Sequence, residues 1–135
     1  MNPRVVGVVA LGGALGAALR YALGEAFPIG TEGFPWTTFG INVSGALLLA
    51  LLPAVAVVRR HELLPPLLGT GVLGGFTTMS AFAEQVRELA HDGHATTAAA
   101  YLVATLVSGI VAVAVADLFS SRAARAEFDV EEGDL

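Results

Sequence analysis

Side chains that can donate hydrogen bonds interrupt the long apolar stretches of this sequence. They are Arg20, Asn42, Ser44, Thr70, Thr77, Thr78, Ser80, Thr105 and Ser108. Such groups are costly inside a membrane unless they line a pathway or pair internally. A serine or threonine hydroxyl can bond to a carbonyl of its own helix, so each hydroxyl alone is weak evidence for a site.

Asn42 and Arg20 are stronger evidence. The amide of Asn42 has two donor hydrogens that its own helix cannot easily satisfy, so we predict that it is an unpaired amide at membrane depth and lines a pathway. Arg20 is the ionisable residue that lies well within an apolar stretch, and it is positive. Donors, one cation and no central carboxylate favour an anion as the transported species.

The stretch "GTGVLGGFTTMSAF" (69–82) contains four glycines, three threonines and a serine where a plain apolar helix is expected. It resembles a phosphate-binding loop superficially, but the chain has no lysine for the phosphates. His91 and His94 could chelate a metal, but no nearby ligand set supports this, and two solvated histidines are favoured. No hydrolase-like combination lies at membrane depth, so we expect no enzymatic activity.

The composition indicates an integral membrane protein. The chain has 135 residues, of which 55% are hydrophobic and 14% are charged, whereas about a quarter of a soluble domain is charged. There are no cysteines, which excludes disulfides and thiolate metal sites. The net charge is −5, and five of the twelve acids lie in the tail that begins at Glu127.

Four segments have the roughly 20 apolar residues that a membrane-spanning helix needs. Their connections are too short for an extramembrane domain. We therefore predict an all-α membrane domain over residues 1–121, with both termini on one side, and an acidic, disordered tail over residues 122–135. The expected spans are 5–24, 36–58, a third from Pro65-Pro66 to Glu84, and 95–116.

Glycines at a spacing of four mark the faces where helices meet. Gly12 and Gly16 form one such pair, and Gly71 and Gly75 form another. This spacing allows close backbone approach, although generic helix packing accounts for it equally well. So small a bundle suggests that the working unit is an oligomer.

Three motifs in order resemble the Fluc (CrcB) family of fluoride channels. They are "GGALGAALRY" (12–21), "TFGINVSGA" (38–46) and "GGFTTMSAF" (74–82). The resemblance covers about residues 4–119. It implies an antiparallel, dual-topology dimer with two fluoride pathways along its interface, and a third helix that is broken near the dimer centre. A broken helix is tolerated in a membrane where protein or water satisfies the freed backbone.

The resemblance also implies site residues. Backbone carbonyls of Gly74 and Thr77 from both subunits would surround a structural sodium ion, for which oxygen ligands are appropriate. Implied partners are fluoride, lipid and a second subunit, either in a homodimer or in a heterodimer with an inverted paralogue; no nucleic acid is expected. The expected anion pathway comprises Arg20, in an aqueous vestibule, with Asn42, Met79, Ser80, Phe82, Tyr101, Thr105 and Ser108.

Two positions depart from the family pattern. Met79 stands where the family has a phenylalanine, and Ala81 stands where it has a threonine. Methionine replaces a polarised ring edge with a flexible thioether, and alanine removes a hydroxyl. Two interpretations are open: either the pore tolerates both residues, or this subunit contributes poorly to one of two pores.

Two other functions are weighed against a fluoride channel. A four-span dual-topology multidrug or cation exporter needs a carboxylate within a span, but Glu25 and Asp117 lie at span ends. A non-conducting structural subunit leaves Asn42 and the glycine-rich stretch unexplained. Arginine is more frequent on the side of the termini, which predicts a multi-pass protein of the inner (plasma) membrane with cytoplasmic termini.

Overall fold

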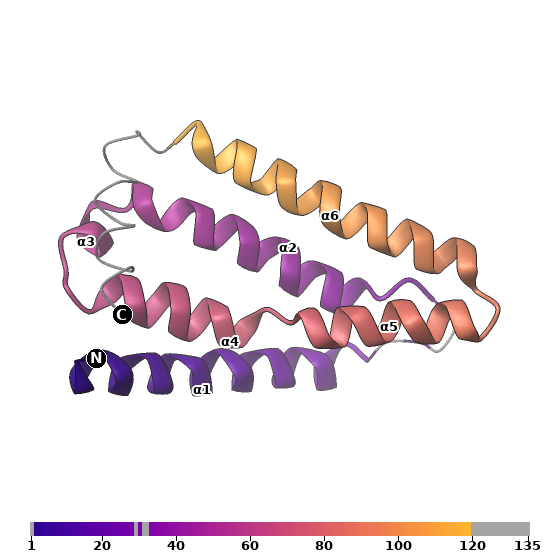
Figure 1. The fold of residues 1–135 in the computed structure, drawn as a ribbon, viewed down its shortest axis with the longest axis horizontal. Helices are drawn as coiled ribbons and strands as arrows, with labels where there is room; N and C mark the ends of the chain where they lie inside the picture. The colour runs from indigo at the N-terminus through magenta and orange to yellow at the C-terminus, as the bar shows by residue number, and fades with distance from the viewer. Residues whose placement is uncertain (1, 29, 31–32, 120–135) are drawn as a thin grey trace.

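The computed structural model describes residues 2–28, 30 and 33–119, and it is helical with no strand in those ranges. Three helices are long and apolar enough to cross a membrane: Pro3–Ala26, Trp36–Ala54 and Ala95–Asp117. They are α1 (Pro3–Ala26), α2 (Trp36–Leu51, extended by the 3-10 turn η1, Leu52–Ala54) and α6 (Ala95–Asp117). The chain runs up and down between the two ends of the bundle (Figure 1).

The second long helix is shorter than the sequence predicted. We expected it to continue to Val58, but α2 and η1 end at Ala54, and Val55 is extended with φ −88° and ψ 103°. Pro53 is the physical reason, because a proline ring has no N–H to donate and clashes with the preceding helical turn. The short helix α3 (Ala56–Arg59) follows at the end of the bundle.

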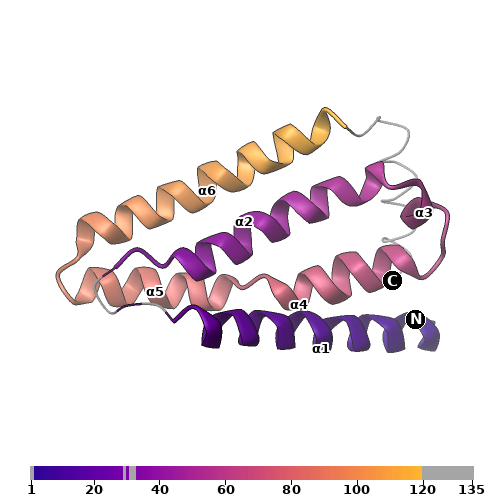
Figure 2. The same ribbon diagram turned by 180° about the vertical axis from the view of Figure 1, so that it is seen from behind.

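The expected third span is two half-helices instead of one helix. The first half is a π-helix, η2 (Pro66–Leu73), continued by α4 (Gly74–Phe76), and the second half is α5 (Met79–His91). Thr77 and Thr78 between them are extended, with ψ values of 159° and 116°. The predicted break is therefore confirmed, and Figures 1 and 2 show it from both sides as a gap between α4 and α5.

Glycines bring the first half-helix close to α1, as their spacing predicted. A Cβ on Gly16 would collide with the Val72 carbonyl oxygen and lie 2.8 Å from the Phe76 nitrogen, and a Cβ on Gly12 would lie 2.9 Å from the Val72 nitrogen. On the other side, a Cβ on Gly75 would collide with the backbone of Gly13. The glycines thus permit contact between the two backbones.

Apolar side chains hold each half of the broken helix separately. Ile41, Leu73 and Phe76 form a buried cluster on the first half. On the second half, Phe82 and Tyr101 are buried with Leu89 and Ala98. Because each half has its own packing, the extended residues between them are fixed at both ends.

Candidate functional site

The break is held open by Asn42 of α2. Its Oδ1 accepts a hydrogen bond of 2.8 Å from the Thr78 N–H, and its Nδ2 donates one of 3.0 Å to the Thr78 carbonyl. The expectation that this amide is unpaired is wrong, because a residue 36 positions later supplies both partners. One hydrogen on Nδ2 remains after these two bonds.

Hydroxyl groups satisfy other parts of the broken backbone. The Thr77 hydroxyl donates to the Leu73 carbonyl at 2.9 Å, within its own half-helix. The Thr78 hydroxyl caps α5 by accepting from the Ala81 N–H at 3.1 Å, and it lies 3.2 Å from the Ser80 hydroxyl. These are local roles of the kind that serine and threonine commonly have at helix ends.

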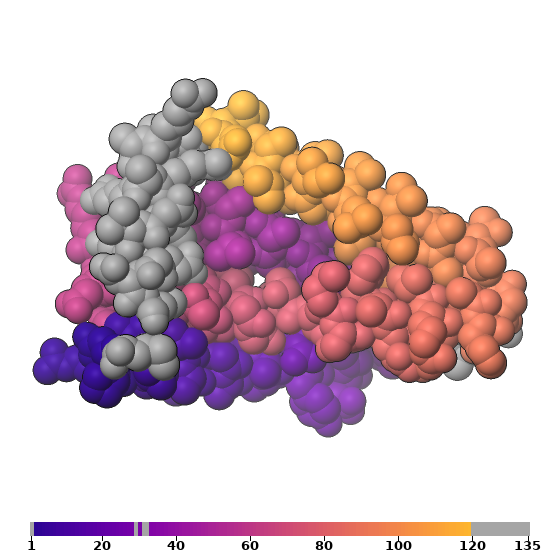
Figure 3. All heavy atoms as spheres, viewed as in Figure 1, coloured from indigo at the N-terminus to yellow at the C-terminus, as the bar shows by residue number. Residues whose placement is uncertain are grey.

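A groove of about 1150 Å³ runs beside the break, between α2, the first half-helix and α6. Figure 3 shows it as a hollow between α6 and the broken helix, with α2 behind it. Its wall is mostly apolar, and it includes Leu49, Leu73, Leu106, Ile110 and Val113. Its polar lining residues are Asn42, Thr70, Thr77, Thr78, Thr105 and Asp117, and Gly74 also lines it beside the break.

Thr105 stands out among the groove residues. Its hydroxyl oxygen is buried and has no hydrogen-bond partner. An unsatisfied buried hydroxyl costs about 1–3 kcal/mol, so the group is available to a ligand or to another chain. Met79 lines the same groove and is 73% exposed in the single chain.

Phe82 and Tyr101 lie outside the groove lining. Their rings pack edge to face with centroids 5.0 Å apart, and Tyr101 is fully buried in this chain. The Tyr101 hydroxyl donates to Gln85 Oε1 at 2.9 Å, and Gln85 Nε2 donates to the Thr38 hydroxyl at 2.9 Å. The phenol proton is therefore already used inside the bundle.

The sequence did not predict a role for Gln85 or Thr38. Their hydrogen bond joins α5 to α2, and the bond from Tyr101 to Gln85 joins α6 to α5. Together these bonds fix the direction of the second half-helix. A signal was present, because Thr38, Asn42 and Gly45 recur at positions i, i+4 and i+7 on one face of α2. The partner on α5 could not be read from that pattern.

Arg20 and Ser108 are also placed away from the groove lining. Arg20 donates from Nε to the Gly75 carbonyl at 3.2 Å, on the α1 side of the broken helix. Ser108 lies on α6, half-buried. Of the expected pathway residues, the groove therefore brings together Asn42, Met79 and Thr105, next to Gly74 and Thr77.

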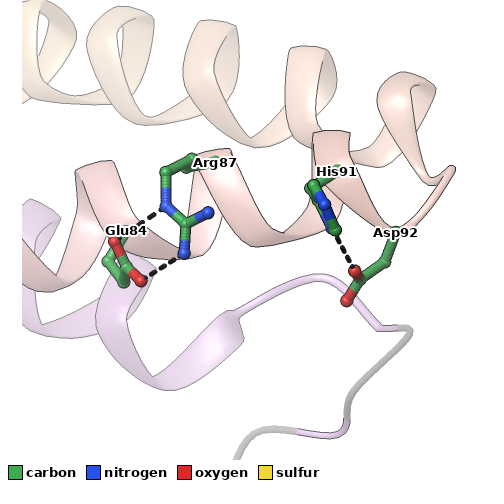
Figure 4. A network of polar contacts seen from close by, with 4 residues as sticks. All are labelled: Glu84, Arg87, His91 and Asp92. Atoms are coloured by element: carbon green, nitrogen blue, oxygen red, sulfur yellow. Dashed lines mark hydrogen bonds and ion pairs between the residues drawn. The ribbon is translucent and has the colours of Figure 1, made fainter.

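The outer end of α5 carries charges in local pairs. Arg87 forms two hydrogen bonds with Glu84, and His91 Nδ1 lies 3.0 Å from Asp92 (Figure 4). Among the described residues, no group of three or more His, Asp or Glu side chains could hold a metal. His91 is exposed and His94 is half-buried, at the turn before α6.

A model of one protein family matches residues 7–116, and its description is "CrcB-like protein, Camphor Resistance (CrcB)". The chain belongs to the CrcB-like family. A relative from Streptomyces coelicolor, named "Fluoride-specific ion channel FluC 1", is 49% identical over 111 residues, which cover 81% of this chain and 72% of the relative. "Fluoride-specific ion channel FluC" of Paracoccus denitrificans is 44% identical over 105 residues, covering 78% of this chain and 85% of the relative.

Membership in the CrcB-like family agrees with the resemblance identified from the three motifs. The matched range includes α1, α2, both half-helices and nearly all of α6. The relatives named above are aligned over most of their own length. The groove and the break therefore both lie within the part of the chain that is common to the family.

Proposed function

We propose that this protein is a subunit of a fluoride-selective channel that lets cytoplasmic fluoride leave the cell passively and so lowers its toxicity. Family membership and the relatives' printed names support a channel rather than an enzyme. The single observation that carries the proposal is the apolar groove lined by the donor-bearing residues Asn42, Thr77, Thr78 and Thr105 beside the break. Among the described lining residues, the one with a carboxylate is Asp117, the last residue of α6. Fluoride is small and strongly hydrated, so such donors must offset its dehydration.

Passive conduction suffices for export because of fluoride's acid–base chemistry. Hydrogen fluoride crosses membranes as a neutral acid, dissociates in the less acidic cytoplasm and is trapped there as the anion. An open, anion-selective path then lets the ion move down its gradient. This function requires a multi-pass protein of the plasma membrane, and the broken helix would be its fourth crossing segment.

A second subunit in the opposite orientation would cover the groove. The groove wall presents large apolar side chains around polar backbone, which suits a protein surface better than lipid, because lipid offers no hydrogen bonds to freed carbonyls. Ile110 and Met79 are about 70% exposed or more in the single chain. Two such subunits would enclose two equivalent paths, one on each side of the paired breaks.

A structural sodium ion at the centre of this dimer fits the residues present. The Thr78 N–H points to Asn42, so the Gly74 carbonyl lacks the donor that a continuous helix would give it. Thr77 is extended, which turns its carbonyl out of the helical direction. Both residues line the groove, and carbonyl oxygens from two chains suit a hard cation. When bound, the ion would neutralise the negative C-terminal end of the first half-helix of each subunit.

Within each path, donors would replace water around the anion. Asn42 has one amide hydrogen left, Thr105 has a buried unpaired hydroxyl, and the hydroxyls of Ser80 and Ser108 are nearby candidates. Phe82 would present the positive edge of its ring, held by Tyr101. A narrow, donor-lined path favours fluoride over chloride.

The test of this function is fluoride efflux from liposomes that contain the purified protein. We expect electrogenic fluoride flux with no chloride flux. Proton-coupled export of an organic cation would support an exporter instead. No flux from this chain alone, with flux restored by an inverted relative, would identify it as the non-conducting partner in a heterodimer.

Restoring a phenylalanine at Met79 is expected to keep or raise the fluoride flux. The side chain is 73% exposed at the groove, and a ring edge is a better partner for an anion than a thioether. Initial efflux rates of Met79→Phe and Met79→Ala, measured at equal protein density, check this. Equal rates for both variants and the parent would mean that this side of the path is not used.

The arginine distribution predicts one dominant orientation with cytoplasmic termini. The sequence predicts Arg4, Arg59 and Arg60 on the side of the termini, with Arg122 and Arg125, which lie outside the described residues, against Arg20 and Arg87 toward the other side. Arg4 and Arg59 lie at the same end of the bundle, at the start of α1 and in α3 (Figure 1). A strongly biased subunit would pair poorly with an inverted copy of itself, but an excess of three is modest, so a homodimer and a heterodimer with an inverted paralogue are both candidates.

The test of orientation is the accessibility of a cysteine engineered at the N-terminus, in cells that express this chain alone. Labelling from the cytoplasmic side only is the expected result. Equal labelling from both sides would contradict the one-way orientation and favour the homodimer.

A further inference from the structure

The last turn before the break points its residues in three directions. Gly74 and Thr77 line the groove, and Phe76 is buried with Ile41 and Leu73 in the bundle. Gly75 faces α1, where a Cβ would collide with the Gly13 backbone. This contact with α1 brings the Gly75 carbonyl within reach of Arg20, one turn beyond Gly16.

Arg20 is bonded to this carbonyl through one defined atom. Its Nε donates to the Gly75 oxygen at 3.2 Å, and the side chain is half-buried. Among the described residues, no carboxylate lies within ion-pair distance of Arg20. The guanidinium is thus committed to backbone at the break and is not paired with an acid.

The two side chains at the break replace two bonds that a continuous helix would make. In a helix, the Thr78 N–H bonds to the Gly74 carbonyl and the Met79 N–H bonds to the Gly75 carbonyl. Here Asn42 takes the Thr78 N–H, and Arg20 takes the Gly75 carbonyl. A cation is also favoured there because the carbonyl end of a helix is negative.

We infer that Arg20 is a positioning residue, which holds the third helix open by capping the Gly75 carbonyl on the α1 side while Gly74 and Thr77 remain available to the groove. This role differs from attracting anions in a vestibule. The inference concerns the backbone of the break and rests on the proposed function only where fluoride flux is the measurement.

Three substitutions separate the hydrogen bond from the charge. Arg20→Gln places an N–H donor at the same number of bonds from the backbone as Arg Nε, without the charge. Arg20→Lys keeps the charge on a flexible ammonium. Arg20→Met has similar bulk with neither feature. Arg4→Gln is the control for loss of one arginine, because Arg4 lies at the start of α1, away from the break.

The first measurement is amide hydrogen exchange of residues 77–79 in the full chain in detergent, which does not depend on conduction. In Arg20→Met we expect exchange faster by about tenfold or more, since one charge-assisted hydrogen bond shifts an equilibrium by at least that factor. Arg20→Gln should stay closer to the parent than Arg20→Met, and Arg4→Gln should leave these amides unchanged.

The second measurement is fluoride flux in liposomes, across ionic strength. We expect the fluoride flux of Arg20→Gln to be at least about tenfold that of Arg20→Met. The ratio of the two fluxes should not depend on the salt concentration, because salt does not screen a hydrogen bond at the break. The inference is overturned if Arg20→Lys matches the parent while Gln falls to the level of Met with a strong salt dependence. If the amides of residues 77–79 exchange no faster in Arg20→Met than in the parent, the inference is overturned whatever the fluoride flux.

Discussion

Replacing Asn42 with aspartate is expected to abolish fluoride flux while the protein still assembles. The carboxylate can still accept from the Thr78 N–H, but it has no donor for the Thr78 carbonyl, which Nδ2 now binds at 3.0 Å. Two oxygens would face each other, and a negative charge would stand in an anion path. The unsatisfied carbonyl alone costs about 1–3 kcal/mol, and the charge adds to it, so the flux should fall at least about a hundredfold.

The measurement is efflux from liposomes, with cross-linking in the membrane to score assembly. Ser44→Ala is the matched control, because Ser44 lies two residues away on α2 and its hydroxyl bonds to the Ile41 carbonyl of its own helix at 3.2 Å. That variant should conduct like the parent. Normal flux from Asn42→Asp would mean that neither the bond to Thr78 nor the charge at this position matters to conduction.

Replacing Gly16 with alanine is expected to lower the stability of the protein. The new Cβ would collide with the Val72 carbonyl and lie 2.8 Å from the Phe76 nitrogen, both of which are backbone atoms that cannot rotate away. Overpacking of this kind costs about 1–3 kcal/mol. The gain of up to about 1 kcal/mol from putting alanine in a helix does not offset it.

Two glycines of the same helix provide matched controls for Gly16→Ala. A Cβ on Gly7 would meet nothing within 4 Å, and one on Gly13 would lie 3.9 Å from the Gly71 carbonyl oxygen, which is an ordinary van der Waals contact. Both Gly7→Ala and Gly13→Ala should unfold in detergent at the temperature of the parent or above it, whereas Gly16→Ala should unfold at a lower one. Equal unfolding temperatures for all three variants would contradict the close contact between α1 and the first half-helix.

Local chemistry made much of the fold predictable. Long uncharged segments identify α1, α2 and α6, and the glycines and threonines of 69–82 locate the break, because these residue types weaken a helix wherever they occur. The early end of α2 was also encoded locally, by Pro53, but hydropathy alone extended the segment to Val58. The sodium site and the paired subunits remain proposals, since both depend on a second chain.

The sequence by itself determined the membrane class, the family, the place of the break and the candidate polar residues, since composition, motifs and residue type carry all four. Tertiary structure alone decided what those residues contact. Asn42 meets Thr78 across 36 residues, Arg20 meets Gly75 across 55, and Gln85 meets Thr38 across 47. Periodicity shows which face of a helix a residue occupies, but a hydrogen bond between helices also depends on their register and distance. Those are set here by glycine contacts and by the packing of each half-helix.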